Sequence, residues 1–341
     1  MTSASSSPAD RLEPGAGPKF WDEDPGAEEA DAADGGDDPV LLAIDLGATK
    51  TAVAVTDLRG RPLARSEMPT GSEAGAPSVM RRVADAGRAL LDQVRDPAPA
   101  VAAVAAVTPG IVLEDRVLLA PNNRGWESLG LARELRAAFG VEVAVVDNDV
   151  KAAARAEARW GRLTGSSTGL LVNLGTGLAF AAVVNGEVLL GAHGAAGEFG
   201  YQLTGDAGDR PFAEGGAPLE EIAGGRGIAE RVSACLGRRV TTAEAFALAR
   251  SEPQVRDLLA GALAVLGRHV ANLALAFDPE VIAIGGGMMG SAPAILPVLR
   301  EQLDRAVPYP PRLEAAHFAR DGSLAGAILL ASEAVNAVRP A

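Results

Sequence analysis

Two glycine-containing turns, each closing an apolar run of strand length, are the first features of this sequence that could do chemistry. They are Asp45-Leu46-Gly47-Ala48-Thr49-Lys50 and Leu174-Gly175-Thr176-Gly177. Glycine lets a backbone approach a phosphate closely, and the N–H groups of a turn can bind its oxygens. The hydroxyls of Thr49 and Thr176 could add donors, and Asp45 could hold Mg²⁺ through water. Either turn alone could be an ordinary hairpin, but the pair favours a phosphate clamp.

A carboxylate follows a further candidate strand, in Asp147-Asn148-Asp149. An Ala-rich helix begins here, so Asp149 lies near a helix N-terminus, where the helix dipole favours its ionised form. One interpretation is that Asp149 simply caps the helix. The other is that it acts as the base toward a substrate hydroxyl. A carboxylate suits phosphoryl transfer, because the transition state is loose and the base mainly orients the nucleophile. The residues alone leave both interpretations open.

Two glutamates in glycine-rich surroundings could bind a sugar. Glu198 lies within residues 196–200, Ala-Gly-Glu-Phe-Gly, and Glu220 follows Pro218-Leu219. Sugar hydroxyls are hydrogen-bond donors, and carboxylate oxygens accept them. The alternative is that both glutamates are solvated loop acids. The polar segment 121–126, which holds Asn122 and a tryptophan, could likewise contact a ligand or form a surface turn.

Other catalytic classes find less support in the sequence. No P-loop motif occurs, and the three histidines are scattered. A G-x-G-x-x-G pattern at Gly285, Gly287 and Gly290 comes too late in the chain to begin a dinucleotide-binding domain. A turn against a nucleoside, or a plain strand-to-helix turn, is the better interpretation. The single cysteine, Cys235, excludes an intrachain disulfide, and we expect it to be buried in an apolar helix.

The elements that must position these residues alternate between strand and helix, which predicts an α/β fold. Strand, glycine turn and strand occur twice, around residues 45–50 and 173–178. This weak internal repeat predicts two related halves facing each other. Expected strands cover residues 40–46, 51–55, 62–66, 100–107, 141–146, 169–174, 178–184 and 281–284; expected helices cover residues 79–94, 131–139, 149–160, 255–277 and 323–338.

Composition narrows the class of protein. The chain has 341 residues, of which 48% are hydrophobic, and neither an apolar run long enough to span a bilayer nor a secretory signal is found. We therefore expect a cytoplasmic protein that does not bind membranes. The net charge of −13 argues against wrapping nucleic acid. Residues 1–38 hold eleven acidic and two basic residues and few bulky apolar ones. They predict a disordered acidic tail, or alternatively a docking motif around Phe20 and Trp21.

Taken in order, these motifs resemble the ROK (repressor, open reading frame, kinase) sugar kinases, of the actin-like, hexokinase-type ATPase superfamily. The resemblance runs from about Val40 to the C-terminus. It implies two actin-like (ribonuclease H-like) domains with a ligand cleft between them, and a last helix that returns to the first domain. The motifs that carry it are Asp45 to Lys50, Thr108-Pro109-Gly110, Pro121-Asn122 with Gly125-Trp126, Asn148-Asp149, Leu174 to Gly177, Gly191 to Gly200, Leu219-Glu220, and Asp278-Pro279-Glu280 leading into Gly285-Gly286-Gly287.

The resemblance also implies roles. Asp149 matches the family's catalytic base, which takes the proton of the attacking sugar hydroxyl. The matching sugar-binding positions are Gly110, Asn122, Asn148, Glu198, Tyr201 and Glu220. The positions matching nucleotide and phosphate contacts are Asp45, Gly47, Thr49, Lys50, Gly175, Thr176, Gly177, Gly285, Gly286 and Gly287.

Four departures from the family pattern stand out. Tyr201 occupies a position where family members commonly have a zinc-binding histidine, and residues 212–219 lack the cysteines, so no zinc is expected. Residues 179–181 are Ala-Phe-Ala, where family members often have further glycines. We therefore expect the nucleotide to bind here with a different geometry. Lys151 stands where asparagine is common, and could lower the pKa of Asp149 or contact phosphate. The acidic segment 1–38 cannot form the helix-turn-helix of the repressor branch.

These observations predict an ATP- and Mg²⁺-dependent kinase that phosphorylates a hexose, with glucose as the default and C6 as the expected position. The predicted domains are 39–160 plus 323–341, and 161–322. The alternative function is a sugar-binding sensor with weak or no kinase activity. The sequence does not identify the sugar, and it does not decide between ATP and polyphosphate as the phosphoryl donor. It also leaves open whether the chain forms a homodimer.

Overall fold

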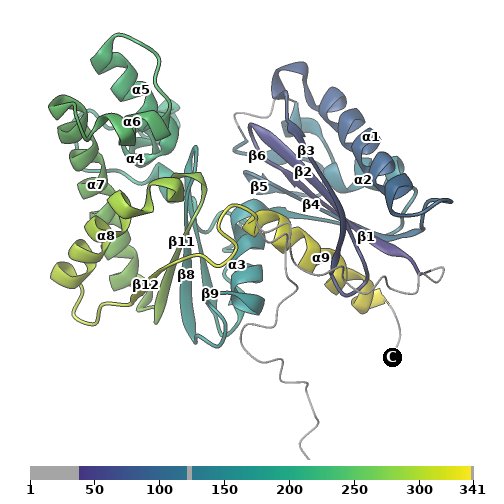
Figure 1. Ribbon diagram of the computed structural model, residues 1–341. Coiled ribbons are helices and arrows are strands. Elements are labelled where there is room, and N and C mark those ends of the chain that lie inside the picture. The colour runs from purple at the N-terminus through teal and green to yellow at the C-terminus, as the bar shows by residue number, and fades with distance from the viewer. Residues whose placement is uncertain (1–37, 121–124, 339–341) are drawn as a thin grey trace, which may run out of the picture.

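The computed structural model describes residues 38–120 and 125–338 and consists of two α/β halves (Figure 1). The acidic segment and Asn122 thus fall outside the described residues, apart from Asp38. Each half holds a five-stranded sheet, of strand order β3-β2-β1-β4-β7 in the first and β10-β9-β8-β11-β12 in the second. In each sheet the first three strands pair antiparallel and the last two join in parallel. The shared topology confirms the predicted repeat of two related halves.

The strands are short and mostly apolar, as their burial requires. In the first sheet they are β1 Val40–Leu46, β2 Lys50–Thr56, β3 Pro62–Pro69, β4 Val101–Thr108 and β7 Ala144–Asn148. In the second sheet they are β8 Thr168–Leu174, β9 Leu178–Val184, β10 Glu187–Val188, β11 Val281–Gly285 and β12 Arg312–Ala315. A small hairpin of β5 (Ile111–Val112) and β6 (Val117–Leu118) follows β4.

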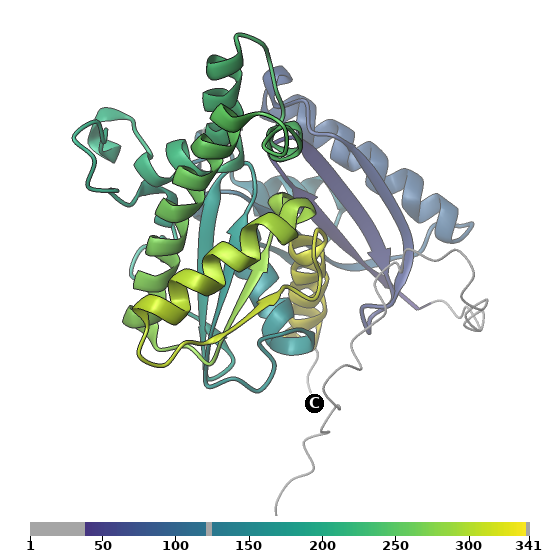
Figure 2. The same ribbon diagram turned by 60° about the vertical axis from the view of Figure 1, so that its left-hand side comes forward.

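Helices cover both faces of each sheet, which explains why the central strands are apolar throughout. One face of the first sheet packs on α1 (Ala76–Val94) and α2 (Leu131–Phe139). One face of the second packs on a larger helical layer, which Figure 2 shows on the side away from the first sheet. This layer comprises α4 Pro218–Ala223, α5 Gly225–Leu236, α6 Thr242–Leu248, α7 Pro253–Phe277 and α8 Ala292–Ala306. Helix α7 is long and apolar enough to cross a membrane by composition, but it packs within this core.

The two remaining helices are exchanged between the halves. Helix α3 (Asp149–Trp160) follows the last strand of the first sheet but packs on the second, whereas α9 (Gly322–Val338) follows the second sheet and packs on the first. The expected return of the last helix to the first domain is therefore confirmed. The two helices pack so closely that only glycine fits at position 326: a Cβ there would lie 2.2 Å from the carbonyl of Ala152. The exchange joins the halves into one unit around a central helix pair.

Most expected elements are confirmed within a few residues, and two expectations need correction. The strand expected at 141–146 lies at 144–148, because its ladder continues to the pair Thr108–Asn148. Cys235 is exposed on α5 rather than buried, because it lies on the outward face of that helix. Thr241 caps α6, and its side chain forms a capping box with Glu244.

Candidate active site

The two halves border a cleft of about 960 Å³, lined by residues 117–120 of the first half and by Tyr201, Glu220 and Arg226 of the second. Asp149 and Glu198 lie near one another beside Glu220, since the charges of Asp149 and Glu220 both act on the carboxyl of Glu198.

Asn148 is the last residue of β7 and also the N-cap of α3: its Oδ1 accepts from the N–H groups of Val150 and Lys151, at 3.0 Å each. Its Nδ2 donates to the carbonyl of Gly110 at 2.9 Å. One amide therefore fixes both the turn after β4 and the first turn of α3.

Asp149 is the first residue inside the helix, so the interpretation that it caps α3 is wrong. Burial in the cleft raises its pKa to about 6, against the lowering effects of the Val150 N–H and of Lys151. Its carboxylate accepts from the Val150 N–H at 2.9 Å. A carboxylate at a helix N-terminus whose pKa lies near 6 has the basicity that a general base at neutral pH requires.

Asp45, at the end of β1, is the other strongly perturbed carboxyl in the cleft. Burial, with the charges of Asp149 and Asp321 nearby, raises its pKa to about 8, although Lys50 and Arg65 oppose this. Lys50 itself is exposed and forms an ion pair with Glu67 on the neighbouring strand. Carboxyls crowded in this way favour a bound cation as the compensating charge.

The two glutamates predicted to bind sugar belong to the second half, and Glu198 lies close enough to Asp149 for the charge of Asp149 to raise its pKa. Glu198 is largely buried, and this burial raises the pKa of its carboxyl, with Lys151 opposing the effect. Glu220 is fixed on both oxygens: Oε2 accepts from the Leu178 N–H at 3.0 Å, and Oε1 pairs with Arg226 at 3.3 Å. Tyr201 lies close to both glutamates, and burial raises the pKa of its phenol. These are not solvated loop acids.

A cavity of about 1000 Å³ opens beside the second glycine turn. Gly175 and Thr176 lie at one end, with Gly287 from the loop after β11. Its walls are mostly apolar and include Phe246, Leu259, Leu263 and Met288; Arg226, Arg250, Arg256 and Arg320 also line it. No carboxylate is among the described residues that line this cavity. None of these arginines was predicted from the sequence as a site residue. Only Arg226 has a neighbourhood that could have pointed to it, because it follows the glycine pair Gly224-Gly225 shortly after Glu220.

A smaller cavity of about 350 Å³ lies behind the same loop and shares Gly175, Gly287 and Arg320 with the larger one. Gly285 and Gly286 line it as well. The glycines predicted to bind nucleotide in the second half therefore meet at one place. In the first turn, Gly47, Thr49 and Lys50 line neither of these two cavities, so the residues predicted to bind nucleotide that line them all belong to the second half.

Comparison with known proteins decides the family. The model of the ROK family matches residues 41–334. The chain belongs to the ROK family. A curated relative, the N-acetylmannosamine kinase of Salmonella heidelberg, is 31% identical over 294 residues, which are 85% of this chain and 97% of the relative.

Solved structures agree with this assignment. The ROK hexokinase of Thermus thermophilus is 31% identical and superposes with a TM-score of 0.70 over 87% of this chain and 99% of that one. A ROK family glucokinase from Streptomyces griseus, in complex with glucose and AMPPNP, is 26% identical with a TM-score of 0.70 over 86% and 99%. This ROK protein is thus a sugar kinase, a phosphotransferase with an alcohol acceptor, and it has the two-domain actin-like fold.

The loop in which ROK proteins commonly bind zinc is held here by hydrogen bonds. Asp209 accepts from the N–H and the hydroxyl of Thr204, at 2.6 and 2.7 Å, and from the Gly205 N–H at 3.0 Å. Gln202 bonds the ring of the buried His269 at 2.8 Å. No group of three potential metal-binding side chains occurs in residues 38–120 and 125–338. Side chains thus supply the cross-links that order this loop.

The other two departures have clear structural roles. Phe180 is buried and packs edge-on against Phe199 and Phe277, so it fills the core of the second half. Lys151 is only 3% exposed, and its Nζ donates to the carbonyl of Gly194 at 2.8 Å. Lys151 therefore ties α3 to the glycine-rich loop 191–200, and its charge lowers the pKa of Asp149 as expected.

Proposed function

We propose that this ROK sugar kinase transfers the γ-phosphoryl group of ATP to the C6 hydroxyl of a hexose, with Asp149 as the base. The observation that carries the proposal is the arrangement at the start of α3. Asn148 takes over the capping role, so the Asp149 carboxylate is not needed as the helix cap, and it lies near enough to Glu198 for its charge to act on that carboxyl. In this arrangement Asp149 accepts the proton of the attacking hydroxyl, while the cleft orients the sugar.

Glu198, Glu220 and Tyr201 of the second half form the proposed sugar site. Carboxylate oxygens accept sugar hydroxyls, and charge-assisted hydrogen bonds of this kind are stronger than neutral ones. Both Oδ1 contacts of Asn148 serve the helix cap, so it contributes through its remaining amide N–H. Glucose is the default sugar, and N-acetylmannosamine, the substrate named for one relative, is the main competitor.

The large cavity supports ATP as the phosphoryl donor. Its apolar walls suit a purine ring, which polyphosphate lacks, and its four arginines suit the phosphates of either donor. Guanine presents two neighbouring N–H donors that a carboxylate binds well. The described residues that line this cavity include no carboxylate. The AMPPNP in the Streptomyces griseus glucokinase complex is consistent with an adenine nucleotide here.

The cleft also fits a Mg²⁺ ion that accompanies ATP. Asp45 is a buried carboxyl near two further acidic groups, Asp149 and Asp321, and a hard cation prefers such oxygens. Asp45 would hold the ion, directly or through water, and the ion would neutralise charge on the β- and γ-phosphates.

The raised pKa of Asp149 predicts the pH dependence of the reaction. The base works only when ionised, so kcat/KM for the sugar should fall as the pH drops through about 6, the pKa of Asp149. A pH series of initial rates checks this. Replacing Lys151 by methionine removes a charge that lowers this pKa, so the midpoint should move to higher pH. An unmoved midpoint would argue against Asp149 as the titrating base.

A sugar and donor panel tests the proposed function. ADP release is measured with ATP over glucose, mannose, fructose, allose and the N-acetylated hexosamines, and product formation is then compared with GTP and polyphosphate. We expect saturable turnover with at least one hexose, and ATP preferred over GTP by about tenfold or more, equivalent to the loss of one or two hydrogen bonds. Absence of turnover on every sugar would contradict the proposal and favour a sugar-binding sensor.

A further inference from the structure

Two hollows of this protein share one side chain. The first is the cavity of about 1000 Å³ beside the second glycine turn, which the proposed function makes the donor cavity. The second is the cleft of about 960 Å³ between the halves, which Tyr201 and Glu220 line and which is called the sugar cleft. Among the described residues, Arg226 is the only one that lines both. A phosphoryl group that moves from the donor to the sugar therefore passes near Arg226.

The backbone of Arg226 is bonded to the second glycine turn. Arg226 is the second residue of α5, and its N–H donates to the carbonyl of Thr176 at 3.0 Å. The N–H of Gly225 donates to the carbonyl of Gly175, also at 3.0 Å. Only glycine fits at position 225, because a Cβ there would lie 2.6 Å from that carbonyl oxygen. These contacts fix the start of α5 against the turn that is predicted to bind phosphate.

The guanidinium of Arg226 lies on the sugar side of this turn, where it pairs with Oε1 of Glu220 at 3.3 Å. Burial raises the pKa of Tyr201, and the charge of Arg226 opposes this, so Arg226 also lies near the phenol. The other oxygen of Glu220 accepts from the Leu178 N–H at 3.0 Å, and a Cβ at Gly177 would lie 2.4 Å from it. Glu220 thus contacts the glycine turn with one oxygen and holds Arg226 with the other.

An arginine at this place can hold a carboxylate and a phosphoryl group at the same time. Its planar guanidinium carries five N–H donors in a fixed fork and binds both groups through charge-assisted hydrogen bonds. In phosphoryl transfer, charge is spread over the equatorial oxygens of the transferred group, and an arginine can stabilise that charge. The Arg226 side chain is 43% exposed, so a bound nucleotide can reach it.

We propose that Arg226 is a further catalytic residue of this kinase, which binds the terminal phosphoryl group of ATP where the donor cavity adjoins the sugar cleft. The inference rests on the proposed function, because it takes the larger cavity as the donor site and Glu220 as a sugar contact. In the transfer, the bond from the γ-phosphorus to the β,γ-bridging oxygen breaks and a bond to the sugar oxygen forms. The hydroxyl proton goes to Asp149, and Arg226 keeps its charge throughout.

Calorimetry of nucleotide binding tests this proposal without turnover, because ADP lacks the phosphoryl group that Arg226 binds. The affinities of AMPPNP and of ADP, each with Mg²⁺, are measured for the wild type, for Arg226→Met and for Arg226→Lys. Two other arginines provide matched controls. Arg250 lines the donor cavity but not the sugar cleft, so Arg250→Met removes the same charge from the donor cavity alone.

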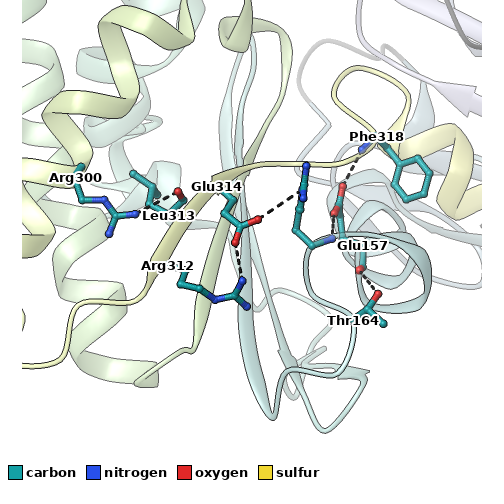
Figure 3. Close-up of polar contacts among 8 residues, drawn as sticks. Glu157, Thr164, Arg300, Arg312, Leu313, Glu314 and Phe318 are labelled. Carbon is teal, nitrogen blue, oxygen red and sulfur yellow. Dashed lines mark hydrogen bonds and ion pairs between the residues drawn. The ribbon is translucent and has the colours of Figure 1, made fainter. Parts of the chain in front are cut away.

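The second control breaks a comparable ion pair elsewhere in the same half. Arg312 is exposed and pairs with Glu314 on β12 at 2.7 Å, and it lines neither the donor cavity nor the sugar cleft (Figure 3). Arg312→Met therefore removes an arginine from an Arg–Glu pair without touching the proposed site.

We expect Arg226→Met to weaken AMPPNP binding by about tenfold, as for losing a hydrogen bond between charged groups, and ADP binding by about twofold at most. Arg226→Lys keeps the charge but not the fork, so its loss of AMPPNP affinity should be smaller. It decides the question by the same ratio if Arg226→Met does not fold. Arg250→Met should weaken both nucleotides by a similar factor, and Arg312→Met should change neither affinity.

Equal losses of AMPPNP and ADP affinity in the Arg226 variants would overturn the proposal. So would a selective loss of AMPPNP in Arg250→Met, because the charge of the whole cavity would then recognise the terminal phosphate. A wild type that binds AMPPNP but phosphorylates no sugar would contradict the proposed function, and the ratio of the two losses would still decide the role of Arg226. A wild type that binds neither nucleotide would overturn both.

Discussion

Replacing Asp149 by asparagine should lower kcat for sugar phosphorylation by about 10²- to 10⁴-fold, the contribution typical of a general base. Asparagine has the shape of aspartate but cannot accept the hydroxyl proton. Sugar affinity, measured by calorimetry without nucleotide, should change little, because the proposed sugar contacts Glu198, Glu220 and Tyr201 remain in place. The expected signature is therefore a loss of kcat with preserved binding of the sugar.

Asp147 provides the matched control for this variant. It lies two residues earlier, at the same strand end, but its carboxylate accepts from the Asn148 N–H at 2.7 Å and pairs with Arg155 at 3.3 Å. Asp147→Asn should retain most of the activity. Undiminished kcat in Asp149→Asn would remove the mechanism, and an equal loss in both variants would assign the effect to the strand end as a whole.

Glu198→Gln should raise KM for the sugar by about 10- to 100-fold, the range expected when a hydrogen bond to a charged group is weakened at a buried site. Glu198 lies in a largely buried position between Lys151 and Glu220, so water cannot readily replace the lost acceptor. The effect on kcat at saturating sugar should be smaller than the effect on KM, because Asp149 and the nucleotide site remain in place.

Glu221→Gln is the control for Glu198→Gln. Glu221 follows Glu220, a residue of the proposed sugar site, but its carboxylate is half-exposed and accepts from the Ala217 N–H and from Arg210. Its replacement should leave KM for the sugar within about twofold, as for most surface changes. Equal KM values in Glu198→Gln and the wild type would show that Glu198 does not contact the sugar.

Much of the secondary structure could be predicted from local sequence patterns, because strands and helices depend on the short-range spacing of apolar residues. The helices 131–139 and 149–160 and the strand 178–184 begin and end where the sequence predicts. Both glycine turns follow from the same local signal. The exchange of α3 and α9 between the sheets was only half predicted. The return of α9 came from the family resemblance, and the packing of α3 on the second sheet was not anticipated.

The parts that escaped prediction all depend on contacts distant in the sequence. Glu157 looks like an ordinary polar residue of an Ala-rich helix, although it is buried and accepts a hydrogen bond from the Phe318 N–H, 161 residues away (Figure 3). The same holds for Lys151 and Gly194, and for the loop that Asp209 orders without the zinc ligands of its family. Exposure of Cys235 was missed because α5 is amphipathic: only one side of this helix is buried, and Cys235 lies on the other.

The measurement that tests the central claim most directly is ³¹P NMR of the wild-type protein with ATP, Mg²⁺ and the preferred hexose of the panel. The account predicts that a hexose 6-phosphate resonance grows in step with ADP, and that neither appears at a comparable rate when the sugar is omitted. Release of inorganic phosphate in place of a sugar phosphate, or ADP formation that does not depend on the sugar, would contradict it.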